Sequence, residues 1–252
     1  MSFLRVIPIL LLRDSGLVKT INFKKSTYIG DPINAVKIFN QKEVDELVLL
    51  DIDASVENYE PNFDWIEDIV SESFMPIGYG GGIKNISHVK RIFELGVEKV
   101  IINSALRDFD LLSEAISIYG SQSIVACIDV KKSLFGKQYC YLKSGKEKIK
   151  LDVVEWAIQL EKIGVGEIII QSIDFEGKMS GYDIDTIKKV SESVNIPVVA
   201  SGGAGSLSDM KDVFNLTKAT AAAAGSIFVY KGPQRGVLIN YPNREELDNL
   251  NN

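Results

Sequence analysis

The sequence is poor in the side chains that most metal and disulfide sites use. Its 252 residues include two cysteines and one histidine. Cys127 and Cys140 form no CxxC motif and no Cys/His cluster, so we expect neither a metal site nor a disulfide framework. The single His88 falls within a helical pattern, and we expect it on a helix surface. We expect no cofactor.

The sequence also lacks a basic excess, a long apolar run and a leader-like start. Its net charge of −6 leaves no basic face for nucleic acid. The first apolar run is too short to span a bilayer and has no basic region before it or small-residue cleavage site after it. We therefore expect a cytoplasmic protein with no nucleic-acid and no membrane partner.

What the sequence does contain is an internal repeat. Residues 47–55 (LVLLDIDAS) match residues 168–176 (IIIQSIDFE) at an offset of 121 positions. Gly81-Gly82 recurs as Gly202-Gly203 at the same offset, and residues 6–12 match residues 124–130 at an offset of 118. The repeat predicts two half-molecules, roughly 1–120 and 121–252, that form one closed body.

Short apolar runs alternate with amphipathic stretches along the whole chain. The predicted strands are 4–12, 46–52, 76–80, 98–103, 123–130, 166–172, 196–201 and 220–225. The predicted helices are 32–41, 65–73, 87–95, 111–119, 152–163, 184–193 and 207–216. Continuous apolar strands between helices indicate a parallel sheet buried on both faces. Eight such units in two related halves predict a single-domain (β/α)8 TIM barrel over residues 1–252.

Two segments break the alternation, and both follow strands at their carboxyl ends. Residues 14–30 are polar and show no period, so we expect a long mobile loop. Residues 131–150 alternate on either side of Ser144-Gly145, which predicts a β-hairpin inserted after the fifth strand. The carboxyl ends of the strands are where barrels of this kind carry their chemistry.

Glycine runs end two of the predicted strands. Gly80-Gly81-Gly82 follows the third strand, and Gly202-Gly203 follows the seventh. Glycine lets the backbone approach a phosphate and point its N–H groups at the oxygens. One strand further on, each run is followed by a small polar pair, Asn103-Ser104 or Gly225-Ser226. The sequence thus predicts two phosphate sites on opposite sides of the barrel mouth, suited to a ligand with a phosphate at each end.

Polar side chains lie at or just past the carboxyl ends of several strands, where they are placed for acid–base work. They are Asp51, Asp129, Gln171, Ser172, Asp174 and Glu176. The repeat sets Leu11 against Asp129, so one half of the molecule offers a carboxylate where the other offers an apolar side chain. Asp14 is too far along the chain to replace it, because three residues after Leu11 the strand has ended.

Four charged residues stand at the opposite ends of the strands. They are Arg5, Glu46, Lys99 and Glu167. Two positive and two negative charges at the entrance of an apolar barrel are costly unless they pair with one another. They could form a neutral plug or a gate that passes something small, and periodicity leaves both readings open.

Over nearly its whole length the chain resembles the HisF family, the cyclase subunit of imidazole glycerol phosphate synthase. The matching segments are Arg5–Pro8, Gly30–Pro32, Asp45–Ile52, Gly80–Ile83, Lys99–Asn103, Ser180–Asp183 and Ala200–Gly205. The resemblance implies a HisH-like glutaminase docked on the N-terminal barrel face. Ammonia from that partner would pass the barrel and attack a bisphosphorylated ribulosyl substrate at the mouth.

The resemblance also implies roles for individual residues. The ammonia gate would be Arg5, Glu46, Lys99 and Glu167. The phosphate-binding residues would be Gly82, Asn103 and Ser104 on one side and Gly203, Ala224 and Gly225 on the other. Lys19 would close over the ligand from the mobile loop, and Asp129 would be catalytic.

The chain departs from the family where the second catalytic aspartate belongs. The family's Cys-Leu-Asp motif is Ile9-Leu-Leu11 here, and its aspartate in the strand-six loop is Glu176. The tail at 231–242 resembles second-copy homologues that work in surface-glycan biosynthesis with an ATP-dependent amidotransferase. That branch turns a sugar acetamido group into an acetamidino group. The alternatives are a working histidine-pathway cyclase and a scaffold with vestigial phosphate sites.

Overall fold

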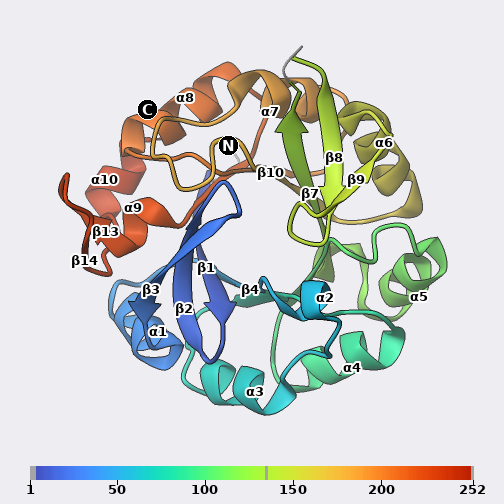
Figure 1. The fold of residues 1–252 in the computed structure, drawn as a ribbon, viewed down its shortest axis with the longest axis horizontal. Coiled ribbons are helices and arrows are strands. Elements are labelled where there is room, and N and C mark those ends of the chain that lie inside the picture. Colours follow the sequence, from blue (N-terminus) through green and yellow to red (C-terminus); the bar gives the residue numbers. More distant parts are fainter. Residues whose placement is uncertain (1–3, 134–135, 251–252) are drawn as a thin grey trace.

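The computed structural model describes residues 4–133 and 136–250, and its core is a closed barrel of parallel strands (Figure 1). The barrel strands are β1 (Arg5–Arg13), β4 (Leu47–Asp51), β5 (Ile77–Gly80), β6 (Lys99–Ile102), β7 (Ile124–Lys132), β10 (Glu167–Ser172), β11 (Val198–Ser201) and β12 (Ala221–Ala224). They pair in chain order, and β10 pairs with β7 as well as β11, so no barrel strand is left at an edge. The predicted (β/α)8 TIM barrel is confirmed.

Helices surround the barrel in the positions that the apolar periodicity predicted. They are α1 (Pro32–Gln41), α3 (Phe63–Ser71), α4 (Ile86–Glu94), α5 (Phe109–Tyr119), α6 (Val153–Ile163), α7 (Ile184–Ser191) and α8 (Leu207–Leu216). Each begins after an Asp, Asn or Ser whose side chain accepts a backbone N–H of the first turn. The short elements not predicted are α2 (Ala54–Glu57), a 3-10 turn (Ser121–Ser123), α9 (Ser226–Val229), β13 (Tyr230–Lys231), β14 (Gly236–Val237) and α10 (Arg244–Asp248).

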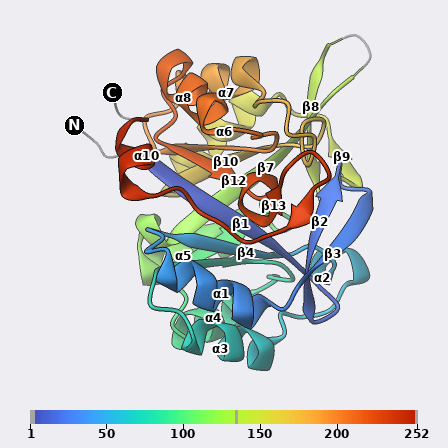
Figure 2. The same cartoon turned by 90° about the vertical axis from the view of Figure 1, so that its left-hand side faces the viewer.

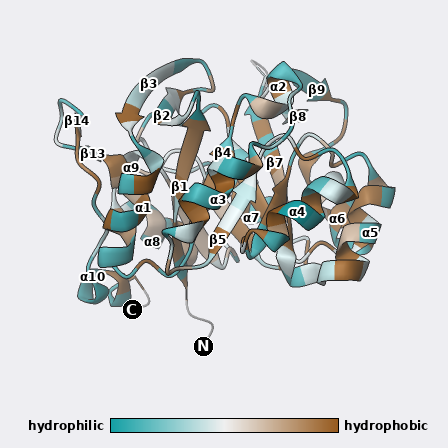
Figure 3. Cartoon of the chain, turned by 90° about the horizontal axis from the view of Figure 1, so that it is seen from below, coloured by the Kyte–Doolittle hydropathy of each residue, from teal (hydrophilic) through white to brown (hydrophobic). Residues whose placement is uncertain are grey.

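The apolar residues form two separate cores, one outside the barrel wall and one inside it. Along β1, Val6, Leu10 and Leu12 pack outward against the helices. Ile7, Ile9 and Leu11 pack inward with residues of the other strands. This alternation follows from the period of two in a strand. In Figure 3, β1 is brown along most of its length, and helices such as α3 and α4 carry teal segments.

Two antiparallel hairpins extend from the barrel strands at their carboxyl ends. One is made of β2 (Gly16–Ile21) and β3 (Lys25–Gly30), and β2 pairs with β1. The other is made of β8 (Gln138–Leu142) and β9 (Glu147–Ile149), and β8 pairs with the end of β7. Both lie at the same end of the barrel, and α10 lies at the opposite end (Figure 2).

The hairpin predicted within 131–150 is therefore confirmed, whereas the loop predicted over 14–30 is wrong. The segment forms a hairpin because two pairs of residues reverse the chain with positive φ. These are Asp14-Ser15 (46° and 63°) and Asn22-Phe23 (52° and 58°). Turns of this hand match the twist of the strands that they connect. No helix in the described part of the chain is both long and apolar enough to cross a bilayer.

Candidate active site at the barrel mouth

A pocket opens at the carboxyl ends of the strands, beneath the two hairpins. We call it the mouth pocket, and residues from both halves of the chain line it. Of the residues singled out from sequence, its wall contains Leu11, Lys19, Asp51, Gly82, Asn103, Ser104, Asp129, Gln171, Glu176 and Gly225. No group of three or more His, Cys, Asp or Glu side chains in the described ranges is arranged to hold a metal ion.

Asp129 lies near the end of β7 and is 5% exposed. Its register partners are Gln171 on β10 and Tyr141 on β8. Burial raises the pKa of Asp129 well above its ordinary value, and the nearby Glu176 carboxylate raises it further. The shift favours the protonated form, so Asp129 is suited to donate a proton to a bound ligand.

Leu11 lies near the end of β1, also in the wall of the mouth pocket, and is 7% exposed. It belongs to the inner apolar cluster and faces Val18 across the β1–β2 ladder. Asp14 lies in the exposed turn that joins these strands and is not part of the pocket wall. No carboxylate among the described residues therefore takes the place that the repeat assigns to the partner of Asp129.

A chain of buried polar contacts crosses the pocket on the side of β10 and β11. The Lys19 Nζ donates to Glu176 Oε1 at 2.9 Å, and Gln171 Nε2 donates to Glu176 Oε2 at 3.0 Å. The Ser201 hydroxyl donates to Gln171 Oε1 at 2.5 Å. Lys19 was expected in a mobile loop, but it lies on β2 and is 5% exposed. It already occupies the mouth, because the hairpin carries it there.

The first predicted phosphate site lies in the pocket wall, where Ser55 and His88 support its glycine turn. The Gly82 N–H donates to Ser55 Oγ at 3.2 Å. His88 Nδ1 lies 3.3 Å from the Gly82 carbonyl oxygen. His88 is 6% exposed, so the surface position expected for it is wrong: its ring is buried beneath the turn. Asn103 Nδ2 donates to the Cys127 carbonyl at 3.0 Å.

The second predicted phosphate site is only partly in the pocket wall. Gly225 contacts the pocket, and a Cβ added to it would lie 2.2 Å from Lys19 Nζ. Gly203 and Ala224 are buried and are not part of that wall. The Gly203 carbonyl accepts the Gly181 N–H at 3.0 Å, which joins the glycine run to the loop after β10. On this side of the mouth pocket, the Lys19 ammonium group therefore lies close to the backbone of Gly225.

The remaining carboxylates accept hydrogen bonds from backbone N–H groups and from Arg13 at the rim of the mouth. Asp51 Oδ1 accepts the N–H groups of Asp53 and Ala54 at 3.0 and 2.9 Å, and burial raises the pKa of Asp51. Asp53 accepts two hydrogen bonds from Arg13, both 2.6 Å. In the second half, Asp174 and Ser172 lie outside the pocket wall, and Asp174 Oδ2 accepts the Lys132 N–H at 2.7 Å.

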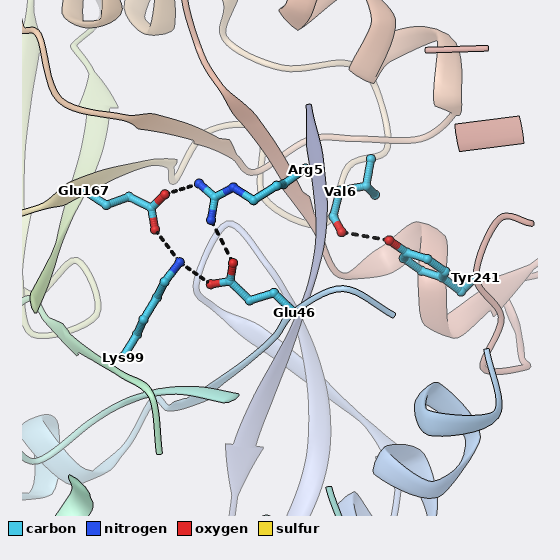
Figure 4. Close-up of polar contacts among 6 residues, drawn as sticks. All are labelled: Arg5, Val6, Glu46, Lys99, Glu167 and Tyr241. Atoms are coloured by element: carbon cyan, nitrogen blue, oxygen red, sulfur yellow. Dashed lines mark hydrogen bonds and ion pairs between the residues drawn. The ribbon is translucent and has the colours of Figure 1, made fainter. Parts of the chain in front are cut away.

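At the floor of the barrel the four charged residues form a closed ring, which we call the charged quartet (Figure 4). Arg5 donates to Glu46 at 2.8 Å and also to Glu167. Lys99 donates to the same two carboxylates, at 2.7 and 3.0 Å. Each cation thus bridges both anions. Figure 4 also shows Tyr241, whose hydroxyl donates to the Val6 carbonyl at 2.8 Å and anchors the C-terminal segment beside β1.

A narrow apolar space lies directly above the charged quartet. Its wall includes Glu46, Lys99 and Glu167 at the bottom and residues of the inner cluster above them. The space does not admit a sphere the size of water. Ile9 and Ile101 line both this space and the mouth pocket. The charged quartet, the narrow space and the mouth pocket therefore follow one another along the inside of the barrel.

Comparison with known proteins identifies the family. The model of the family described as histidine biosynthesis protein matches residues 5–234. A provisionally assigned hisF2 subunit of imidazole glycerol phosphate synthase from Pseudomonas aeruginosa is 51% identical over 245 residues, covering 97% of this chain and 98% of the relative. The chain belongs to the HisF family.

Other HisF relatives match over most of their length. A provisionally assigned hisF3 subunit from Vibrio vulnificus is 48% identical over 244 residues, which is 96% of this chain and 94% of the relative. The imidazole glycerol phosphate synthase subunit HisF of Alkaliphilus metalliredigens is 39% identical over 227 residues, 90% of each chain. The resemblance stated from sequence is thereby confirmed at the level of the family.

Several residues of this HisF chain's mouth were not found from sequence. They are Arg13, Thr20, Ser55, His88 and Ser201. Thr20 was missed because 14–30 was taken for a loop with no fixed orientation, and Arg13 because the predicted first strand ended at residue 12. The repeat offers a signal for the hairpin, since the turn residues 22–23 align with residues 143–144 at the offset of 121.

Proposed function

We propose that this HisF-family barrel receives ammonia from a HisH-like glutaminase and delivers it for the conversion of a sugar acetamido group into an acetamidino group in surface-glycan biosynthesis. An ATP-dependent amidotransferase would activate the acetamido group. The barrel would bind a bisphosphorylated or nucleotide-sugar-type ligand at its mouth. The observation that carries the proposal is Leu11, an apolar side chain in the pocket wall where the repeat calls for a second carboxylate.

The loss of one acid or base matters most when two groups act together. A missing general acid–base group costs about 10²–10⁴ in rate, and more where the pair works as a unit. Asp129 alone, buried and with a raised pKa, can give or hold one proton. Ring closure that needs a base and an acid on opposite faces of the ligand would then lack the base.

The remaining machinery supports ammonia delivery. The charged quartet closes the floor, and among the described residues the hydrogen bonds of Lys99 Nζ go to Glu46 and Glu167, so movement of Lys99 away from these carboxylates would leave Arg5 as their bridge. The space above it is too narrow for a water-sized molecule in this conformation, so passage of ammonia would require its aliphatic side chains to move apart. Those side chains give no hydrogen bonds that would retain ammonia. A HisH-like glutaminase on the floor would release ammonia directly at this ring.

The test reconstitutes the barrel with its glutaminase and the ATP-dependent amidotransferase, using glutamine labelled with ¹⁵N in the side-chain amide. We expect the label in the acetamidino product only when the barrel is present. Excess unlabelled ammonium should dilute the label little, because ammonia inside the barrel does not exchange with the solvent. Equal labelling without the barrel, or full dilution by ammonium, would contradict the proposal.

A second candidate is the histidine-pathway cyclase that makes imidazole glycerol phosphate. Asp129 favours it, since this carboxyl is buried in the wall of the mouth pocket, which also contains Gly82 and Gly225 of the two predicted phosphate sites. The names of the HisF relatives fit this role equally well. The two candidates differ in one measurable property, which is turnover of the bisphosphorylated ribulosyl substrate with ammonium supplied directly.

A further inference from the structure

Thr20 carries a buried hydroxyl that no described side chain or backbone group satisfies. It lies on β2 and is 3% exposed, and its Oγ1 has no hydrogen-bond partner among the described residues. A hydroxyl taken out of water without a partner destabilises the free protein, so such groups call for an explanation. Thr20 lines the mouth pocket, so a ligand bound there would supply the missing hydrogen-bond partner.

The hairpin fixes Thr20 against the far wall of the mouth. A Cβ added to Gly177 would lie 2.1 Å from the Thr20 carbonyl oxygen, so the two backbones are in close contact. Two residues further on, Asn22 Nδ2 donates to the carbonyls of Ile173 and Asp174, both at 2.8 Å. Thr20 is therefore held on both sides and does not depend on a flexible segment for its position.

Strand alternation sets the direction of the Thr20 side chain. Val18 faces Leu11 across the ladder and belongs to the inner cluster. Thr20 follows Val18 by two residues, so it shares that face of β2. The β2 strand thus places Val18 opposite Leu11 and the Thr20 hydroxyl next to this apolar pair. Lys19 lies between Val18 and Thr20 on the opposite face of β2. Its long side chain nevertheless reaches Glu176 Oε1 and the backbone of Gly225, so Lys19 and Thr20 both line the mouth pocket.

We propose that the Thr20 hydroxyl is a ligand-contacting group, which hydrogen-bonds an oxygen of a phosphorylated sugar next to the anionic group that Lys19 and Gly225 receive. This inference rests on the proposed function, because it requires a phosphorylated ligand in the mouth pocket. Lys19 provides charge, and Thr20 provides a neutral contact that depends on where the sugar oxygen lies. Thr20 would therefore act on ligand selection more than on overall anion affinity.

Two other buried side-chain atoms in the described ranges lack partners, and neither lines the mouth pocket. They are Trp156 Nε1 and Thr220 Oγ1. Thr220 is a matched control, since it has the same side chain and the same unpaired atom at the opposite end of the barrel, just before β12. A variant at Thr220 tests the effect of deleting an unpaired hydroxyl without touching the mouth.

The experiment compares Thr20→Val, Thr20→Ser and Thr220→Val with the unchanged chain. The probe is the bisphosphorylated ribulosyl substrate, titrated by calorimetry, and thermal melting is recorded with and without it. Valine keeps the shape of threonine and removes the hydroxyl. We expect Thr20→Val to bind the probe about 10-fold more weakly, the cost of one lost hydrogen bond. Thr20→Ser and Thr220→Val should bind it within about 2-fold of the unchanged chain.

The ligand-free melting temperatures give an independent readout. Thr20→Val should melt at or above the unchanged chain, because the hydroxyl has no partner to lose. Unaltered probe affinity in Thr20→Val would overturn the inference, and so would a lower ligand-free melting temperature, which would reveal a partner within the protein. If the unchanged chain fails to bind the probe, the bisphosphorylated ligand is excluded, and the same variants are titrated with a nucleoside diphosphate sugar, the other ligand class of the proposed function. The ligand-free melting comparison then still decides whether the Thr20 hydroxyl is unpaired.

Discussion

Leu11 and Asp129 stand at equivalent places in the two halves of the barrel, and the difference between them determines the chemistry available at the mouth. Both side chains are buried in the same pocket wall. Leucine at position 11 gives this wall neither a charge nor the proton acceptor that a two-carboxylate mechanism needs. The lost group is therefore expected to affect rate far more than it affects ligand binding.

Restoring the missing carboxylate tests this directly. We expect Leu11→Asp to raise ammonium-dependent cyclisation of the ribulosyl substrate by about 10²–10⁴ over a negligible starting rate. Leu11→Asn has the same shape and no base, so it should give no gain. Both variants should lose about 3 kcal/mol of unfolding free energy, because each buries a polar group among aliphatic neighbours. A rate gain in Leu11→Asn as large as in Leu11→Asp would contradict the account.

The buried carboxyl of Asp129 predicts a pH dependence of stability. Its pKa is raised in the folded chain, so the folded state holds the proton more tightly than the unfolded state. That contribution is fully present below the ordinary pKa of an aspartate, about 3.9, and is lost as pH rises through the raised value. Compared with the unchanged chain, Asp129→Asn should therefore gain stability as pH increases from about 4 to 8. Melting curves across this range measure it, and a constant difference would refute it.

At the scale of elements, the two hairpins show what the sequence could and could not predict. The β8–β9 hairpin was found because its residues alternate around Ser144-Gly145. The β2–β3 hairpin was not, because its turn uses Asn22-Phe23 and the turn before it uses Asp14-Ser15, and neither pair contains a glycine. These turns form as β1 pairs with β2 and β2 pairs with β3, and strand pairing is an effect that local propensity does not report.

The hairpins also latch across the mouth in equivalent ways. Asn22 donates to the Ile173 carbonyl and Ser144 donates to the Ile52 carbonyl, each at 2.8 Å. Ile52 and Ile173 are separated by the repeat offset of 121. The tips touch, since a Cβ on Gly145 would lie 3.3 Å from Phe23 Cδ2. Each half of the molecule thus holds its hairpin over the mouth by a hydrogen bond to an isoleucine carbonyl of the other half.

The charged quartet gives a prediction about stability at the floor. Lys99→Met leaves Glu46 and Glu167 with one cation between them, and their side chains are only 9% and 8% exposed. We expect a loss of about 1–3 kcal/mol, below the full cost of a buried charge because Lys99 itself is partly exposed. Lys90→Met, which removes an exposed pair with Glu94, should cost less than about 0.5 kcal/mol. Urea denaturation measures both, and equal costs would contradict a coupled quartet.

For the whole molecule, the repeat and the alternation of strands and helices were enough to predict a closed barrel. The starts and ends of strands also placed the charged quartet at one end and the carboxylates at the other. The sequence could not show which glycines face the pocket, since Gly225 does and Gly203 does not. That distinction depends on how the loop after β10 packs against the glycine run, where Gly181 bonds to Gly203.

The central claim is that this barrel has kept its ammonia path and ligand site and has lost the second catalytic carboxylate. The most direct measurement is turnover of the bisphosphorylated ribulosyl substrate by the isolated chain with ammonium salts, alongside calorimetric binding of the same compound. We expect binding without turnover at ordinary enzyme rates. Turnover at about 1 s⁻¹ or faster, which is ordinary for enzymes, would contradict it and assign the chain to the histidine pathway.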